Sequence, residues 1–207
     1  MKVLITGGAG YIGSNTVYHL LDSGFEIEVI DDFSTASKNL LPKGLKIFEI
    51  NVGAGDKVTK IIKDFSPDAI IHFAGSVEVE ESVINPIKYY KNNIAESINF
   101  FNSCINGGVQ NLIFSSTAAV YGDSKDKFIN ENNKKNPKSP YATTKLFLEN
   151  VINNLSLSYN LKSIIFRYFN VAGADKKLRS GQIKEPASHL IKIACETALS
   201  KRKEIKV

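Results

Sequence analysis

The stretch TGGAGYIG at residues 6–13 decides the fold. It follows a short run of apolar and β-branched residues, Lys2–Thr6, and opens a segment, 11–23, with apolar residues at helical spacing. Its glycines permit a tight turn, a close approach of the backbone to a pyrophosphate, and close packing of helix on strand. A helix that starts at such a turn offers N–H groups to an anion. The stretch therefore predicts a dinucleotide-binding turn between a strand and a helix.

An acidic pair follows the next apolar run of the sequence. Residues 28–30 have the pattern of a second strand, and Asp31 and Asp32 come directly after it. Asp31 lies 18 residues after Gly13, close to the spacing of a carboxylate that bonds the adenosine ribose of a dinucleotide. A carboxylate at this place favours a free 2′-hydroxyl group, so the cofactor expected is NAD rather than NADP.

Strands and helices alternate along the rest of the chain. Apolar runs of strand length lie at 46–48, 69–72, 112–115 and 163–167, and helical patterns lie at 57–65, 84–106, 141–157 and 186–199. This alternation predicts an α/β fold with a Rossmann-type doubly wound parallel sheet. Continuous apolar strands indicate that both faces of the sheet are covered. Sites in such sheets lie at the carboxyl ends of the strands.

The pattern divides the chain near residue 172. Residues 1–172 hold the whole alternation and are expected to form an NAD-binding Rossmann domain. Residues 173–207 hold a charged loop, the helical pattern 186–199 and a basic segment from Lys201 that begins to look like a strand. This second part is expected to be the start of a truncated substrate-binding lobe.

Composition and charge narrow the function classes. The chain has 207 residues, of which 43% are hydrophobic and 23% charged, the balance of a globular protein and not of a disordered chain. No apolar run approaches the ~18 residues of a membrane span, so no membrane partner is expected. The two cysteines, Cys104 and Cys195, lie far apart without metal-type spacing and indicate reduced core thiols in a cytoplasmic protein.

Neither the basic nor the acidic residues point to a nucleic-acid or metal site. Residues 134–207 carry a net charge of +10 and residues 1–133 one of −5, which gives +5 for the chain. The basic part lacks any known nucleic-acid-reading motif, so no nucleic-acid partner is expected. The acidic residues Glu78, Glu80 and Glu81 have no histidine or aspartate at ligand spacing, so a solvated face is expected there and no metal.

A tyrosine and a lysine stand four residues apart at the start of the helical segment 141–157. The spacing places Tyr141 and Lys145 on one face of the helix. An ammonium group favours phenolate, so Lys145 is expected to lower the pKa of Tyr141 and make it a proton acceptor. Ser115 and Thr117, at the end of the fifth strand, bring hydroxyl groups to the same edge of the sheet. These residues form a proton-handling set for hydride transfer at a carbinol carbon.

Further motifs stand in register with these: HFAG at 72–75, YYKNN at 89–93, FSSTAAVYG at 114–122, SPYATTK at 139–145 and RYFNVAGA at 167–174. Through them the sequence resembles the extended short-chain dehydrogenase/reductase family over nearly its whole length, and most closely its nucleotide-sugar 4-epimerases. The resemblance implies NAD as cofactor and a UDP-sugar as substrate. The implied reaction is the reversible epimerisation of a UDP-hexose (UDP-glucose or UDP-galactose) at C4 through a transient 4-keto sugar.

The resemblance also implies roles for the residues that match its motifs. The implied catalytic residues are Tyr141 as the base, Lys145 on the nicotinamide ribose and Thr117 as the hydroxyl partner. The cofactor is implied to contact Gly7, Gly10, Tyr11, Ile12, Gly13, Asp31, Asp32, Asn51, Val52, Phe73, Ala74, Gly75, Asn92, Ser115, Tyr141, Lys145 and Tyr168. The implied substrate-binding residues are Thr117, Tyr141, Asn170 and His189.

Some positions depart from relatives of the same kind. Ala118 and Ala119 stand where sugar-nucleotide 4,6-dehydratases carry an acidic pair, so a dehydratase is not expected. Val77 replaces a lysine near the cofactor phosphates, and Asn51 replaces an aspartate that holds adenine. Family members run on for roughly another hundred residues, the size of a small lobe. The chain therefore resembles an epimerase that has been cut short.

Alternatives to the lead interpretation stay open at this point. The chain could be a truncated NAD-binding protein without turnover, or an epimerase of another nucleotide sugar such as UDP-N-acetylglucosamine or a UDP-uronate. A nucleic-acid binder ranks last. The resemblance further implies a homodimer in which helices 84–106 and 141–157 pair across a two-fold axis.

Overall fold

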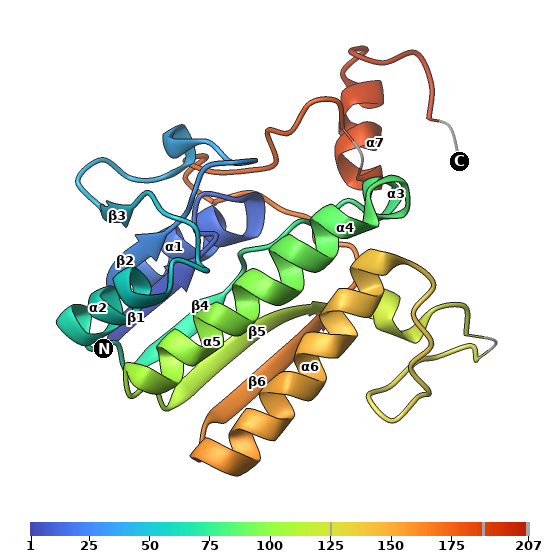
Figure 1. Ribbon diagram of the computed structural model, residues 1–207. Coiled ribbons are helices and arrows are strands. Elements are labelled where there is room, and N and C mark those ends of the chain that lie inside the picture. The colour runs from blue at the N-terminus through green and yellow to red at the C-terminus, as the bar shows by residue number, and fades with distance from the viewer. Residues whose placement is uncertain (125, 188, 206–207) are drawn as a thin grey trace.

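Six parallel strands form one sheet in the computed structural model, which describes residues 1–124, 126–187 and 189–205 (Figure 1). The strand order is β3-β2-β1-β4-β5-β6. The bounds are β1 Lys2–Thr6, β2 Glu26–Ile30, β3 Lys46–Phe48, β4 Ala69–His72, β5 Asn111–Thr117 and β6 Lys162–Tyr168. The order runs outward in both directions from β1, which confirms the doubly wound sheet expected from the sequence.

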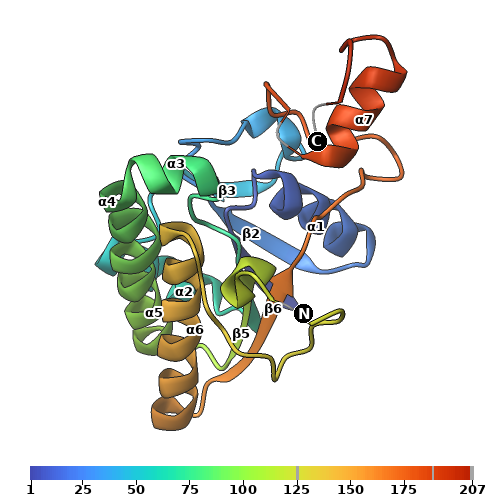
Figure 2. The same cartoon turned by 90° about the vertical axis from the view of Figure 1, so that its right-hand side faces the viewer.

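Helices connect the strands and lie on both sides of the sheet. They are α1 Tyr11–Asp22, α2 Gly55–Phe65, α3 Val79–Ile84, α4 Pro86–Tyr89, α5 Glu96–Asn106, α6 Pro140–Tyr159 and α7 Leu190–Ala198. A π-helical turn, Tyr90–Ala95, joins α4 to α5, and short 3₁₀ turns lie at Lys38–Leu40 and Ala118–Tyr121. Helices α2, α5 and α6 cover one face, and α1 covers part of the other (Figures 1 and 2).

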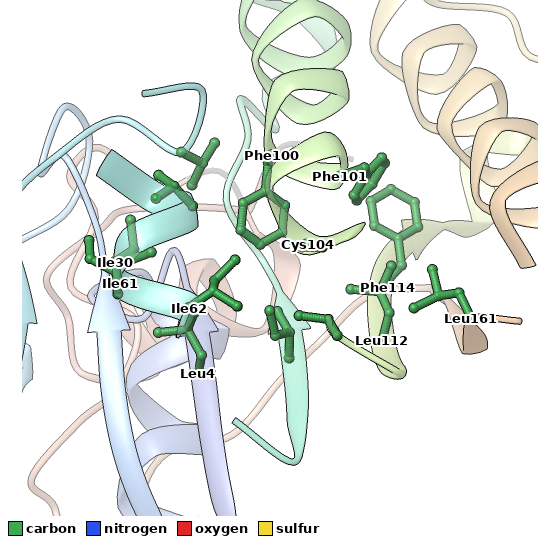
Figure 3. Close-up of a cluster of buried hydrophobic side chains, with 14 of the residues drawn as sticks. Leu4, Ile30, Ile61, Ile62, Phe100, Phe101, Cys104, Leu112, Phe114 and Leu161 are labelled. Carbon is green, nitrogen blue, oxygen red and sulfur yellow. The ribbon is translucent and has the colours of Figure 1, made fainter. Parts of the chain in front are cut away.

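The larger core fills the space between the sheet and the layer of α2, α5 and α6 (Figure 3). Phe100 and Phe101 of α5 meet Phe114 of β5 there, beside Leu4 of β1 and Ile62 of α2, and all five side chains are fully buried. Burial of side chains this large contributes about 1.5–3 kcal/mol each. This core fixes α5 and α6 against the strands whose ends carry the site.

The opposite face is covered only near α1. A second cluster, Val3, Ile5, Val29 and Ile71 among others, lies under α1 and ends at the partly buried Ile113. On β6 the same face carries Ile164 and Phe166, which are 54% and 44% exposed. The expectation that both faces are covered is therefore wrong for β6. The physical reason is the position of α1. In the described part of the chain, α1 is the helix on this side of the sheet, and it contacts β1 and β2.

The long helix expected over residues 84–106 is wrong in its start and its continuity. Helix α3 begins at Val79, and Asn85, with φ −129° and ψ 68°, separates it from α4. The residue before a proline is disfavoured in helical conformation, and Pro86 follows Asn85 directly. Three expected strands, 2–6, 46–48 and 69–72, occur with the expected bounds, and the other expected strands and helices occur with at least one end moved by one to four residues. Residues 201–205 form no strand, and residues 206–207 lie outside the described residues.

Both cysteines are free thiols. Cys104 lies in the larger core, as expected, and burial raises the pKa of its thiol. Cys195 is exposed, so the expectation of a core thiol is wrong there, because α7 buries none of its residues.

Within residues 1–124, 126–187 and 189–205, no helix has the length and apolar character that crossing a membrane requires.

Candidate active site

The glycine-rich loop between β1 and α1 lies against the chain that follows β4. Gly7 has φ +68°, and a Cβ there would lie 2.6 Å from the backbone nitrogen of Ala74. A Cβ at Gly13 would lie 2.2 Å from the carbonyl oxygen of Gly7. Only glycine fits at these two positions. A Cβ at Gly10 would meet only that same oxygen, at 3.3 Å, so this side of the loop is open.

The start of α1 remains available to an anion. Its N-cap residue is Gly10, and in the described part of the chain no side chain caps it. The first N–H groups of a helix lack partners within the helix, and the helix dipole makes this end positive. An open glycine surface beside an uncapped helix start fits the pyrophosphate of a dinucleotide.

Asp31 ties this loop to the end of β2. One carboxylate oxygen accepts a hydrogen bond from the N–H of Ala9 at 2.8 Å, and the other accepts from the N–H of Phe33 at 2.9 Å. Burial raises the pKa of Asp31, and these two hydrogen bonds act in the opposite direction. Each oxygen keeps a second lone pair, so the carboxylate can hold the loop and still accept from a ribose hydroxyl.

Asp32 and Asn51 bond to each other across the ends of β2 and β3. The Asn51 amide donates to Asp32 at 3.0 Å and accepts from the N–H of Gly53 at 2.8 Å. Burial works to raise the pKa of Asp32, but hydrogen bonds from Ser34 and Asn51 outweigh it and the pKa is lowered. Val52, which follows Asn51 in the chain, is buried in the larger core. Asn51 thus orients Asp32 at the carboxyl ends of β2 and β3.

The chain leaves β1 and β4 toward opposite faces of the sheet, which makes the space at their carboxyl ends the expected binding crevice. Phe73, Ala74 and Gly75 follow β4 at this place. Ala74 touches the glycine loop, and a Cβ at Gly75 would lie 3.7 Å from the Nζ of Lys145. The candidate dinucleotide turn and the tyrosine–lysine pair therefore lie on one crevice.

Tyr141 and Lys145 lie in the first turns of α6. The helix starts at Pro140, and the Ser139 side chain accepts from the N–H of Ala142 at 3.2 Å, a strong N-terminal signal. Lys145 is 2% exposed, and its Nζ donates to the carbonyl oxygen of Ser115 at 2.9 Å. The same ammonium lies 5.0 Å from the ring centre of Phe114. The pair thus faces the carboxyl end of β5.

The Thr117 hydroxyl bonds to the phenol of Tyr141. Its oxygen already accepts from the N–H of Ala119 at 3.2 Å, so its proton can be donated to the phenol oxygen. Burial raises the pKa of Tyr141, the bond from Thr117 lowers it, and the nearby Glu78 raises it. The expectation that Lys145 gives Tyr141 a lowered pKa is therefore wrong in this state, because burial outweighs the other effects. Burial also lowers the pKa of Lys145 to about 8.

Two asparagines of the π-helical turn contact Ser76 beside this pair. Asn92 donates to the Ser76 hydroxyl at 3.0 Å. Asn93, which the sequence argument overlooked, is buried, accepts from the N–H of Ser76 at 2.8 Å and donates to Thr144 at 3.1 Å. Asn93 thereby joins the chain after β4 to α6. π-Helical turns occur frequently at functional sites, but the sequence carried no signal for this one.

The remaining candidate residues are Tyr168, Tyr11, Asn170 and His189. Tyr168 is half-buried and stacks on Phe166, with ring centres 5.9 Å apart, and the Tyr11 hydroxyl donates to the carbonyl oxygen of Gly173 at 2.6 Å. Asn170 is exposed, and His189 contacts Gln182. Among the described residues, neither Asn170 nor His189 is hydrogen-bonded to Tyr141, Thr117 or Lys145.

Glu149, which is buried, and Arg167, which is half-buried, are further polar residues to which the sequence analysis gave no role. Glu149 lies one helical turn after Lys145 on the same face of α6 and pairs with Arg167 of β6 at 2.7 Å. The available sequence signal was the spacing of four residues between Lys145 and Glu149. This spacing places the Glu149 carboxylate on the helix face that Tyr141 and Lys145 share.

The sequence profile of the NAD dependent epimerase/dehydratase family matches residues 3–207. A UDP-glucose 4-epimerase of Azospirillum brasilense is 41% identical over 97% of this chain and 58% of its own length. The crystal structure of UDP-glucose 4-epimerase from Brucella ovis in complex with NAD matches with a TM-score of 0.94 and 34% identity, over 100% of this chain and 63% of that one.

A third match is the UDP-Glc/GlcNAc 4-epimerase of Campylobacter jejuni, with a TM-score of 0.83 and 41% identity, over 97% of this chain and 63% of that one. The chain thus spans about three fifths of the length of these relatives. The profile match covers nearly every residue, and the glycine loop, the crevice and the tyrosine–lysine pair lie within it. The chain belongs to the NAD dependent epimerase/dehydratase family.

Proposed function

We propose that this chain binds NAD and carries the acid–base residues that epimerise a UDP-hexose at C4, interconverting UDP-glucose and UDP-galactose. The observation that carries the proposal is the arrangement of Tyr141, Thr117 and Lys145 at the crevice that also holds the open glycine loop. The three relatives described above act on UDP-sugars by their names, and one was solved with NAD.

The residues present fit NAD. The glycine loop and the start of α1 would hold the pyrophosphate, with Gly7, Gly10, Tyr11, Ile12 and Gly13 along it. Toward the adenosine lie Asp31, Asp32, Asn51 and Val52, and toward the nicotinamide lie Phe73, Ala74, Gly75, Asn92, Ser115, Lys145 and Tyr168. NAD, when bound, supplies an acceptor for the hydrogen at C4 of the sugar and, as a cation, favours the Tyr141 phenolate.

Tyr141 would accept the proton of the C4 hydroxyl and later return it. Its raised pKa keeps the phenol protonated without ligands, so a neighbouring positive charge is needed before it acts as a base. Thr117 would donate its hydrogen bond to the phenolate oxygen, and Lys145 would hold the nicotinamide ribose. Ala118 and Ala119 after Thr117 carry no acid–base group, which favours epimerisation over dehydration.

Two residues would bind the nucleotide sugar. His189 lies within residues 173–207, and Asn170 lies just before this segment. We infer that Gly173 begins a second, substrate-binding lobe, since α7 buries none of its residues and the preceding loop carries few core contacts. The sugar is not defined by the crevice residues, and UDP-N-acetylglucosamine or a UDP-uronate remain alternatives.

A second candidate function is NAD binding without turnover. It is favoured by the exposed Asn170, which among the described residues is not hydrogen-bonded to Tyr141, Thr117 or Lys145. We also infer a reducing compartment, the cytoplasm, because Cys195 is exposed and free.

A homodimer through α3–α5 and α6 is part of the proposal. Apolar side chains are exposed on these helices: Val83, Ile84, Ile87, Tyr90, Ile98 and Phe147. Scattered single apolar residues are ordinary on a surface, but a row on adjacent helices marks an interface. Helix α6 contacts both α3 and α4, so the row is continuous.

The test is turnover of UDP-galactose in the presence of NAD, followed by reduced-nicotinamide fluorescence and by formation of UDP-glucose. We expect Tyr141→Phe to reduce turnover at least ~100-fold and leave NAD bound. Tyr159→Phe, on the exposed end of the same helix, is the matched control and should change nothing. NAD binding by the native chain without any conversion would favour the second candidate function, and loss of NAD binding in Tyr141→Phe would make the tyrosine structural.

A further inference from the structure

A buried ion pair lies directly behind the candidate acid–base residues. Glu149 of α6 is 2% exposed, and Arg167 of β6 donates to its two carboxylate oxygens, from Nη2 at 2.7 Å and from Nε at 3.0 Å. This two-pronged geometry is the most specific that a carboxylate and a guanidinium form. The pair fixes α6 relative to β6.

The same pair reaches three other segments. The Ser116 hydroxyl of β5 donates to Glu149 at 2.5 Å. Arg167 donates through Nη1 to the Tyr121 hydroxyl at 2.7 Å, and its guanidinium lies 5.2 Å from the centre of that ring. Arg167 Nη1 also donates to the carbonyl oxygen of Glu131 at 3.3 Å. Five segments therefore meet at one carboxylate and its partner: β5, the 3₁₀ turn Ala118–Tyr121, the loop at Glu131, α6 and β6.

Two members of this network, Ser116 and Glu149, lie next to residues of the candidate site. Ser116 stands between Ser115, whose carbonyl oxygen holds Lys145, and Thr117, whose hydroxyl meets Tyr141. Glu149 lies on the helical face of Tyr141 and Lys145. A shift of the end of β5 along α6 would therefore change both of those contacts together.

A pair of this kind is poorly explained as a stabilising device. Removing two charges from water costs about as much as their attraction returns, and well-packed apolar residues often serve the fold as well. A buried polar network instead specifies one arrangement of the segments that it joins.

We propose that Glu149, with Arg167 as its partner, is a positioning residue that fixes the carboxyl end of β5 against α6. In this role it keeps the Ser115 carbonyl oxygen on Lys145 and the Thr117 hydroxyl on Tyr141. The importance of this positioning for catalysis rests on the proposed function, but the geometry can be tested without turnover.

The decisive variant is Ser116→Ala, because it cuts the link between β5 and Glu149 without changing any charge. The readout is the titration of the Lys145 side chain by NMR on the full chain with ¹³C- and ¹⁵N-labelled lysine, with the signal assigned by its absence in Lys145→Met. Ser163→Ala is the matched control, since Ser163 also joins a strand to α6, through Ser156 at 3.1 Å, but at the other end of the sheet.

We expect Ser116→Ala to lower the titration midpoint of Lys145 by about half a pH unit, because the ammonium loses part of its carbonyl acceptor. Glu149→Gln should lower it further, and Ser163→Ala should leave it in place. A midpoint in Ser116→Ala equal to that of the native chain would overturn the proposal, whether or not Glu149→Gln folds. If the native chain turns over UDP-galactose, Ser116→Ala should lower kcat with little change in KM. If it shows no turnover, the proposed function fails while the Lys145 titration still decides the positioning role.

Discussion

Lys145 is a buried ammonium that folding alone does not favour. It is 2% exposed, and its hydrogen bond goes to a neutral carbonyl oxygen of Ser115. Burial lowers its pKa to about 8, below the ordinary value of 10.5. Between these two pH values the unfolded chain binds more protons than the folded one, so stability rises with pH in that window. Below pH 8 the folded state bears the full free-energy cost of burying the Lys145 charge.

Lys145→Met is therefore expected to stabilise the fold at pH 7. The free energy of unfolding should rise by about 1–3 kcal/mol, and the gain should shrink as the pH is raised from 8 toward 10.5. Urea unfolding at pH 7 and pH 10 measures it, with the exposed Lys60→Met as control. A gain that is equal at both pH values would show that packing of the methionine, and not the buried charge, is responsible.

Asp31 shows what a sequence can and cannot define at the scale of one residue. Its distance from Gly13 and its place after a strand predicted a carboxylate at the end of β2. The bonds to the N–H groups of Ala9 and Phe33 could not be predicted, because they depend on how the glycine loop folds back on β2. Glu149 was missed for a related reason: its partner Arg167 lies on a strand 18 residues later, and nothing local joins the two.

At the scale of elements, the glycine loop is the part most tightly constrained by contact. A Cβ at Gly13 would lie 2.2 Å from the Gly7 oxygen and 2.8 Å from the Gly8 Cα, both of them backbone atoms that no side-chain rotation can move away. The first turn of α1 and the loop are therefore one rigid unit.

Gly13→Ala is expected to push α1 away from the loop, to abolish NAD binding and to lower the free energy of unfolding by about 2–4 kcal/mol. Isothermal titration with NAD and urea unfolding measure the two effects. Gly181→Ala serves as the control, because a Cβ there would meet only Ala174 at an ordinary 3.5 Å. NAD binding at native affinity in Gly13→Ala would contradict the assignment of this turn to the pyrophosphate.

Elements with strong local signals were predicted well, and those defined by tertiary contacts were not. Helix α6 has its Ser139 cap, Pro140 and a continuous helical pattern, and its expected span of 141–157 lies within the observed Pro140–Tyr159. The segment 84–106 is predicted as one helix, but Pro86 follows a break at Asn85 and a π-helical turn lies farther along it. The continuous apolar character of β6 predicts two covered faces, whereas Ile164 and Phe166 are exposed.

At the scale of the whole molecule, two separate surfaces with exposed apolar side chains are relevant to association. One is the β6 face opposite α6, with Ile164 and Phe166, and the other is the helical row of α3–α5 and α6. The helical row is formed by elements that the larger core holds firmly, through Phe100 and Phe101 on α5 and Leu148 on α6. A surface built on rigid elements can associate without the cost of ordering flexible segments.

Ile87 tests whether the helical row joins two copies of the chain. It is 73% exposed on α4, next to Ile84, which is 84% exposed. Ile87→Glu places a charge at the centre of the proposed two-fold contact, where its desolvation or its repulsion from the second copy would oppose association. Light scattering after size exclusion should give a dimer mass for the native chain and a monomer mass for Ile87→Glu. Leu178→Glu, at the equally accessible loop site after β6, should leave the dimer intact. A dimer in both variants would place the contact outside the helical row. The exposed β6 face would then be tested with Phe166→Glu, a substitution that leaves the helical row unchanged.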